Sequence, residues 1–159
     1  MALDVEQIVR REVVVEASQQ RCFDVFTTGF DSWWPRESHH IGDADATEVA
    51  IEPRVGGRWL ERGVDGSECT WGHVLAWEPP SRIRLAWQLN AQWQFDPDED
   101  VATFVEVTFT PLDDGSTRVE VTHSGFERAV DGAKIASGVA AEGGWGSLLE
   151  LYAAELSRA

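Results

Sequence analysis

The sequence is poor in positive charge and contains no long apolar run. Its 13 Lys and Arg residues stand against 28 Asp and Glu residues, which gives a formal net charge of −15 at pH 7. An acidic surface of this kind repels phosphate backbones and anionic lipid headgroups, so we expect neither nucleic acid nor membrane as a partner. No apolar stretch approaches the roughly 18 residues that a membrane-spanning helix needs.

Cysteine is also scarce, because Cys22 and Cys69 are the only two. Two cysteines cannot make a disulfide framework, and their spacing matches no metal motif. The first residues of the chain mix charges and lack the basic-then-apolar order of a secretory signal. These features predict a cytoplasmic protein without a cofactor, and the absence of repeats and linkers predicts one domain over residues 1–159.

The pattern of apolar residues predicts a strand, two short helices and then a long run of strands. Residues 8–16 alternate and are β-branched, which is typical of a strand. Ser18 suits the N-cap of a helix that runs to about Thr28, and a second helical turn at 30–34 ends before Pro35. Short, turn-rich segments then separate six candidate strands, so neighbouring strands should pair antiparallel as a meander. The six strands are expected at 46–53, 56–63, 67–78, 82–89, 102–110 and 116–125.

The last part of the chain is amphipathic and predicts a long helix over about residues 137–158. Its apolar stripe consists of Trp145, Leu148, Leu149, Tyr152 and Leu156. Gly143, Gly144 and Gly146 leave the first residue of this helix open. A sheet with one apolar face and a helix with one apolar stripe pack most economically against each other. We therefore predict an α+β fold, in which the long C-terminal helix crosses a curved, seven-stranded antiparallel sheet.

Several short motifs follow one another in order over about residues 8–156. They are Trp33-Trp34-Pro35, the segments 53–59, 71–74, 78–80, 83–87 and 117–119, and Gly144-Trp145 with Leu148 and Leu149. In this order they resemble the SRPBCC superfamily (START-like, Bet v1-like or helix-grip proteins). Within it, the chain is most similar to the bacterial branch that resembles the C-terminal domain of the activator of Hsp90 ATPase. The resemblance implies a helix-grip fold with a mostly apolar cavity between the sheet and the terminal helix.

The sequence has eight tryptophans, and all except Trp77 come from elements that this fold would bring together. Indole side chains suit cores and pocket walls alike, so pure core packing and the lining of a ligand pocket both remain open. Leu149 joins them as a residue of the helix that faces the sheet. The residues predicted to bind a ligand are Trp33, Trp34, His40, Trp59, Glu61, Trp71, His73, Trp87, Trp93, His123, Trp145 and Leu149.

Three polar candidates among these residues depend on which face of a strand they occupy. Glu61 should share a face with Trp59, where it could act as a general acid or base, hold the polar end of a ligand, or form an ion pair with an arginine. Strict alternation places His73 on the face of Trp71, and His123 falls on an apolar face of the last strand. A single histidine in such a place is usually a hydrogen-bonded core residue.

The most metal-like segment is 38–45, which contains two histidines and two aspartates. Adjacent histidines on an extended chain point in opposite directions, so His39 and His40 should not bind one ion together. We expect no metal here and interpret the segment as a lid or packing element of the cavity.

The leading functional hypothesis is the binding of a small hydrophobic or amphipathic molecule in the cavity. A co-chaperone-like protein-binding module is the first alternative, and a cavity enzyme of the cyclase, hydratase or hydrolase type is the second. A chaperone or a second copy of the chain remains a possible partner. Glu61 is the sole candidate for a catalytic residue.

Overall fold

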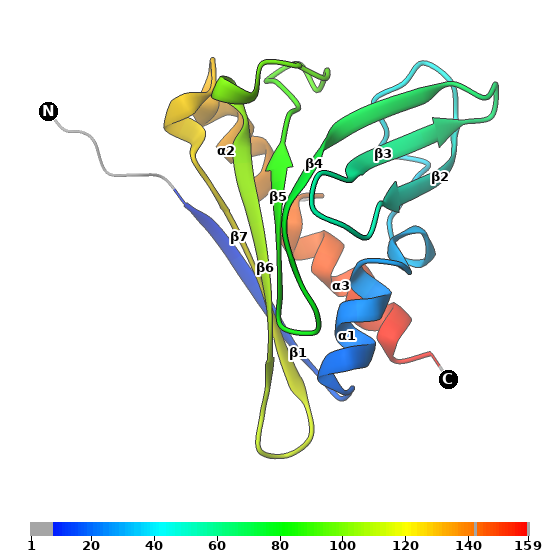
Figure 1. The fold of residues 1–159 in the computed structure, drawn as a ribbon, viewed down its shortest axis with the longest axis vertical. Coiled ribbons are helices and arrows are strands. Elements are labelled where there is room, and N and C mark those ends of the chain that lie inside the picture. Colours follow the sequence, from blue (N-terminus) through cyan, green and yellow to red (C-terminus); the bar gives the residue numbers. More distant parts are fainter. Residues whose placement is uncertain (1–7, 142, 159) are drawn as a thin grey trace, which may run out of the picture.

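The computed structural model describes residues 8–141 and 143–158 and consists of one curved antiparallel sheet with helices on its concave side (Figure 1). The sheet has seven strands in the order β1-β7-β6-β5-β4-β3-β2. From β2 onward each strand pairs with the next one along the chain, and β1 completes the sheet beside β7. The predicted meander is therefore confirmed. The strands are β1 (Val9–Val15), β2 (Ala46–Ile51), β3 (Arg58–Gly63), β4 (Glu68–Glu78), β5 (Arg82–Trp87), β6 (Thr103–Pro111) and β7 (Thr117–Ser124).

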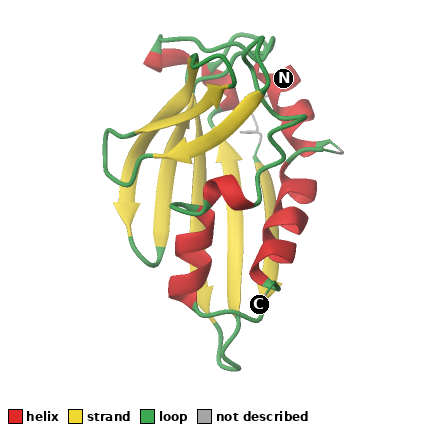
Figure 2. Cartoon of the chain, turned by 90° about the vertical axis from the view of Figure 1, so that its right-hand side faces the viewer, coloured by secondary structure: helices red, strands yellow, loops and turns green. Residues whose placement is uncertain are grey.

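The helices at the two ends of the chain meet on the concave face of the sheet (Figure 2). Helix α1 (Gln19–Phe26) begins where the Ser18 hydroxyl accepts a hydrogen bond from the Arg21 amide, and a 3-10 turn (Phe30–Ser32) follows it. The Tyr152 hydroxyl donates to the Cys22 carbonyl oxygen at 2.6 Å and so joins the C-terminal helix to α1. Within the described residues, no helix is long and apolar enough to cross a membrane.

The C-terminal helix is divided in two, whereas the sequence predicted one helix over 137–158. Helix α2 (Gly132–Ala140) ends before residues 141–144, and α3 (Trp145–Leu156) begins after them. Gly143 adopts a φ of +89°, which side chains other than glycine rarely tolerate. The break therefore follows from the glycine pair at 143–144. As predicted, Trp145 and Leu149 are buried against the sheet.

Alternation predicts the faces of β5 correctly but fails in β4. In β5, Ile83, Leu85 and Trp87 are buried, while Arg82 and Arg84, which alternate with them, pair with Glu106 of β6 on the outer face. Strand β4 contains two bulges, because the register of its pairs skips Trp71 and Leu75.

The bulge at Trp71 moves His73 to the other face of the sheet from the one expected. It places Gly72, rather than His73, opposite the core residues Trp59 and Trp87. His73 lies opposite Arg58 and Ala86 instead, and its Nδ1 lies 2.6 Å from Oε1 of Gln88. The prediction that His73 shares the face of Trp71 is therefore wrong, since one extra residue in a strand reverses the alternation after it.

Candidate functional site

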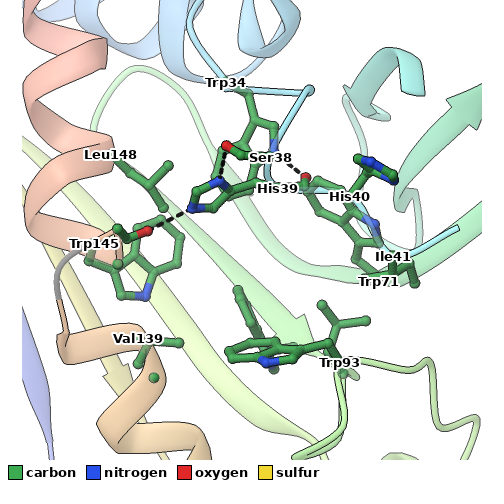
Figure 3. A pocket seen from close by; sticks show the side chains of 15 residues that line it. Trp34, Ser38, His39, His40, Ile41, Trp71, Trp93, Val139, Trp145 and Leu148 are labelled. Atoms are coloured by element: carbon green, nitrogen blue, oxygen red, sulfur yellow. Dashed lines mark hydrogen bonds between the residues drawn. The ribbon is translucent and has the colours of Figure 1, made fainter. Parts of the chain in front are cut away.

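A pocket of about 390 Å³ lies between the curved sheet, the loop after Trp34 and the break between α2 and α3 (Figure 3). Its walls come from parts of the chain more than 100 residues apart. The lining residues are Trp34, Ser38, His39, His40, Ile41, Trp71, Trp87, Leu89, Trp93, Gly138, Val139, Gly143, Gly144, Trp145 and Leu148.

Five of the eight tryptophans line this pocket. Their rings pack edge to face or tilted: the centroids of Trp34 and Trp71 lie 5.2 Å apart, and those of Trp87 and Trp145 lie 6.1 Å apart. Four of the five rings are buried, and Trp93 alone of the five is exposed. The result is a rigid aromatic wall with one indole at its border with solvent.

The indole N–H groups of three lining tryptophans are held by groups outside or at the edge of the pocket. That of Trp34 donates to the His39 carbonyl oxygen at 2.9 Å, and that of Trp71 donates to Glu61 at 2.8 Å. Trp145 donates to Nδ1 of His123 at 3.1 Å. The N–H of Trp87 is buried without a partner among the described residues. A buried donor of this kind is costly to leave unpaired, so Trp87 is the one lining indole with a donor still to be satisfied.

Glu61 anchors the loop that forms one side of the pocket. Its side chain is buried, and its carboxylate accepts hydrogen bonds from the amides of Ile41 and Gly42 at 2.6 and 3.1 Å, besides that from Trp71. Charge-assisted bonds of this type are the strong ones in proteins. The position of Glu61 explains why the loop follows the sheet so closely, and the carboxylate lies behind the pocket wall rather than in the wall.

Two neighbouring residues of this loop, Ser38 and His39, connect it to the C-terminal helices (Figure 3). His39 Nε2 lies 2.7 Å from the Gly143 carbonyl oxygen, and its Nδ1 lies 2.7 Å from the Ser38 hydroxyl. A carbonyl only accepts, so a neutral His39 carries its proton on Nε2 and accepts the Ser38 hydroxyl at Nδ1. The imidazole thus spans the pocket between the loop and the α2–α3 break.

The second histidine of the pair points to the opposite side of the loop, as the sequence predicted (Figure 3). His40 Nδ1 lies 3.0 Å from the Gly42 carbonyl oxygen and 3.9 Å from Oε2 of Glu61. Among the described residues, no group of three or more His, Cys, Asp or Glu side chains could hold a metal ion. The Ser38 hydroxyl, both ring nitrogens of His39 and Nδ1 of His40 are used for hydrogen bonds within the protein.

His123 lies behind the pocket, in contact with its wall. Its side chain is fully buried, and burial lowers the pKa of the imidazole to about 3. Nε2 lies 2.8 Å from the Thr103 hydroxyl, and Nδ1 receives the indole N–H of Trp145. His123 therefore positions a lining residue without reaching the cavity.

The two cysteine thiols lack the surroundings of a reactive thiolate. Burial raises the pKa of Cys22, and burial together with the nearby Glu61 carboxylate raises the pKa of Cys69. Neither residue lines the pocket.

Half of the twelve residues that the sequence proposed for ligand binding line the pocket. These are Trp34, His40, Trp71, Trp87, Trp93 and Trp145. The other six lie outside the lining, namely Trp33, Trp59, Glu61, His73, His123 and Leu149. Leu149 is buried one position along α3 from Leu148, which does line the pocket.

Apart from Leu89 and Leu148, the lining residues that sequence reasoning missed fall into two groups. Ser38, His39 and Ile41 belong to the segment 38–45, which the sequence indicated as a lid or packing element of the cavity, although only His40 of this segment was predicted to bind a ligand. Gly138, Val139, Gly143 and Gly144 belong to α2 and the break, and their small side chains carry no chemical signal. Their position beside the sheet depends on the break between α2 and α3. The glycines at 143, 144 and 146 indicated that the helix start was uncertain, but they did not show where the break lies.

Comparison with known proteins places the chain in one family. A family model described as "Activator of Hsp90 ATPase homolog 1-like protein" matches residues 16–156. No functionally curated protein matches the chain. Many solved structures share the fold; one from Mesorhizobium loti, MLL2253, is 24% identical, with a TM-score of 0.67 over 96% of this chain and 98% of that one.

Two similar structures have more informative names. The anthrahydroquino-gamma-pyrone synthase Txn09, complexed with SUM, is 39% identical, with a TM-score of 0.65 over 93% of this chain and 96% of that one. The self-sacrificing resistance protein CalC from Micromonospora echinospora is 29% identical, with a TM-score of 0.69 over 94% and 93% of the two chains. The family match over residues 16–156, the helix-grip architecture and the apolar pocket agree, and the chain belongs to the Activator of Hsp90 ATPase homolog 1-like family within the SRPBCC superfamily.

Proposed function

We propose that the protein binds a planar, fused-ring aromatic molecule in the pocket between the sheet, the loop 38–41 and the α2–α3 break. The observation that carries this proposal is a cavity of about 390 Å³ with five indole rings in its wall. Small-molecule sites are commonly apolar clefts of about 300–1,000 Å³ with a few polar groups that orient the ligand. Flat aromatic surfaces favour flat aromatic ligands, because offset and edge-to-face packing adds to the burial of apolar area.

The polar groups of the pocket gather on one side, which supports a ligand with one polar edge. Ser38, His39 and His40 all come from the same loop, and Figure 3 shows them across the pocket from the apolar residue Val139. The neighbours support the same class of ligand, since one is named as a synthase of a fused-ring pyrone at 39% identity. A phenol or quinone at the edge of a ring system would meet this loop.

The pocket can be tested with 1,8-dihydroxyanthraquinone, a three-ring probe that should quench indole fluorescence when it binds. Trp87→Phe should raise the dissociation constant several-fold, because it replaces an indole that lines the cavity with a smaller phenyl ring. Trp59→Phe is the matched control: its indole is also buried, also lacks a hydrogen-bond partner, and lies 5.6 Å from the Trp87 ring, but it does not line the pocket. Equal effects of the two substitutions, or no binding of any fused-ring probe, would contradict the proposal. Denaturing mass spectrometry of freshly purified protein would identify a ligand that is retained.

A second candidate function, acid–base catalysis on the bound molecule, is favoured by the Ser38–His39 pair. Nδ1 of His39 holds the lone pair and accepts the Ser38 hydroxyl at 2.7 Å, while Gly143 fixes the orientation of the ring. A ligand hydroxyl that takes the place of Ser38 would transfer its proton to Nδ1: the O–H bond breaks and an N–H bond forms. His39→Asn should then abolish turnover of a substrate that still binds, whereas lost binding would assign His39 to the pocket wall alone.

A chaperone-binding role, suggested by the family name, is the third candidate. Large exposed apolar residues, which such a role would need, are spread over several elements: Val14 lies on β1, Leu75 on β4 and Leu151 on α3. A pull-down with a bacterial Hsp90, with and without the anthraquinone probe, separates this role from ligand binding.

A further inference from the structure

Trp93 occupies the border between the pocket and solvent. Its side chain lines the cavity, yet the residue is 43% exposed, whereas the other four lining tryptophans are at most 7% exposed. One side of the Trp93 indole therefore faces the cavity and another side faces water. A ligand that passes this border has to pass Trp93.

The backbone at Trp93 is in a conformation that large side chains rarely adopt. Its φ is +60°, in the left-handed region. Glycine, asparagine and aspartate adopt this region most readily, and bulky side chains are uncommon there. Asn90 holds the turn: its side chain accepts the amides of Gln92 and Gln94, and its carbonyl oxygen accepts the amide of Trp93. Strained residues of this kind gather at binding sites and switch regions, where the surrounding structure keeps them in place.

The turn that carries Trp93 is joined to the sheet by one isolated bridge, and the Trp93 ring also packs against the Trp87 ring of β5, with centroids 6.3 Å apart. Leu89 and Phe95 form an isolated bridge, and the strands β5 and β6 end and begin on either side of it. The indole thus projects from a short turn that can move without breaking the long ladder between β5 and β6.

Gly138 of α2 makes room for the Trp93 ring. A Cβ atom built at this glycine would lie 2.8 Å from Cζ2 and 3.1 Å from Cη2 of Trp93, and no other described group outside this part of the helix would be within 4 Å. Any side chain at position 138 would therefore push the indole away from α2. Glycine is unfavourable in a helix interior, but at position 138 it allows the close contact between α2 and the Trp93 ring.

From these observations we propose that the Trp93 indole is a lid that closes the pocket, and that Gly138 leaves the space into which the closed indole packs. The indole rests on α2 in the closed position and swings with the Asn90 turn to admit a ligand. The proposal rests on the ligand-binding function above and adds to it the residue that controls access and the residue that sets the closed position.

A lid has a kinetic signature that a simple wall residue lacks. Removing a wall residue weakens contacts and raises the dissociation rate constant, while the association rate constant stays the same. Removing a lid raises both constants, because the binding-competent open state no longer has to be reached first. If the open state is populated at roughly 10%, loss of the lid should raise both constants about tenfold.

The test compares Trp93→Ala and Gly138→Ala with the wild type by stopped-flow quenching with 1,8-dihydroxyanthraquinone. Both variants should show association and dissociation rate constants raised about tenfold, if the open state is the minor one. Phe95→Ala is the matched control, because Phe95 is an exposed aromatic residue of the same turn that does not line the pocket. Alanine is the better helix former at position 138, so altered rates in that variant would not stem from a weakened α2.

A second measurement reports on the lid without any ligand. Acrylamide is small and neutral, and it should quench the fluorescence of Gly138→Ala more strongly than that of the wild type, because all eight tryptophans are retained and the pocket is opened. Raised acrylamide quenching in a protein that binds no ring probe would support the lid and refute the binding function. Binding by the wild type with unchanged association rates and unchanged acrylamide quenching in Gly138→Ala would overturn the lid and leave the binding function standing.

Discussion

The indole N–H of Trp145 points at Nδ1 of the buried His123, 3.1 Å away. An indole N–H can only donate, so this nitrogen must hold a lone pair, and the neutral imidazole carries its proton on Nε2 toward the Thr103 hydroxyl. Protonation of His123 would place two donors against each other in a site without water access. Burial itself lowers the pKa of the residue to about 3, because the charged imidazolium would lose its contact with water.

The first prediction concerns the pH dependence of stability. In the unfolded chain a histidine has a pKa of about 6.5, so below that pH the unfolded state binds a proton that the native state takes up only near pH 3. Stability should fall as the pH drops through this window, by about 2 kcal/mol between pH 7 and pH 5. Urea unfolding of the wild type and of His123→Gln at both pH values isolates this contribution, because the other three histidines are common to both. Parallel pH profiles for the two proteins would show that His123 titrates normally in the fold.

The second prediction assigns Glu61 a structural role. Glu61→Gln replaces an acceptor oxygen with an NH₂ group, so one of the N–H groups of Trp71, Ile41 and Gly42 loses its partner in a buried place. The cost should be about 1–3 kcal/mol in the free energy of unfolding, measured by urea denaturation. Binding of the anthraquinone probe should weaken as well, because the loop loses its anchor. Glu68→Gln, at an exposed ion pair of the outer face, should change both quantities far less.

A Glu61→Gln protein with unchanged stability and binding but lost turnover would instead point to acid–base chemistry at this carboxylate. That outcome would revive the role that the sequence suggested for Glu61 and would contradict the anchoring role.

The third prediction tests the packing of α3 on the sheet. Leu149→Ala should lower the free energy of unfolding by about 2–5 kcal/mol, because the side chain is 2% exposed and its loss leaves a cavity. Leu151→Ala, two positions along the same helix, should have little effect, since Leu151 is 44% exposed. A loss for Leu149→Ala no larger than that for Leu151→Ala would mean that the contacts of Leu149 with the sheet do not stabilise α3.

The fourth prediction concerns the two thiols. Their raised pKa values leave little thiolate at neutral pH, so both should react with a disulfide reagent more slowly than a free cysteine. Cys69, which is partly exposed, should react before the fully buried Cys22. Modification of Cys22 in the native protein at the rate of a free thiol would show that the contact between α1 and α3 opens readily.

The sequence predicted the strands and their pairing well because these depend on local pattern. The alternation of Ile83, Leu85 and Trp87 marks a strand with one buried face, and short turns leave antiparallel pairing as the simple solution. The face of His73 was wrong because a bulge depends on the partner strand, and nothing in residues 68–78 alone reveals that Trp71 is skipped.

The pocket was predictable only in part, for a similar reason. The many tryptophans of the sequence predict an aromatic wall. Trp59 and Trp87 are neighbours in similar surroundings, however, and the position of α2 and α3 decides which of them lines the cavity. Glu61 was identified as a buried carboxylate, yet its partners at 41 and 42 lie on a loop whose path no local pattern specifies.

The interruption between α2 and α3 has a consequence for how the pocket evolves. In an unbroken helix, the carbonyl oxygen of residue 143 would accept a hydrogen bond from the amide four residues later. The His39 imidazole would then face a carbonyl oxygen that already has a partner. The glycine pair frees this oxygen and turns it toward the cavity, where it meets Nε2 at 2.7 Å. A relative that fuses the two helices would have to give up the cross-link or supply a side-chain acceptor for it. A main-chain oxygen at the break, and not a lining side chain, is therefore the partner of His39 Nε2.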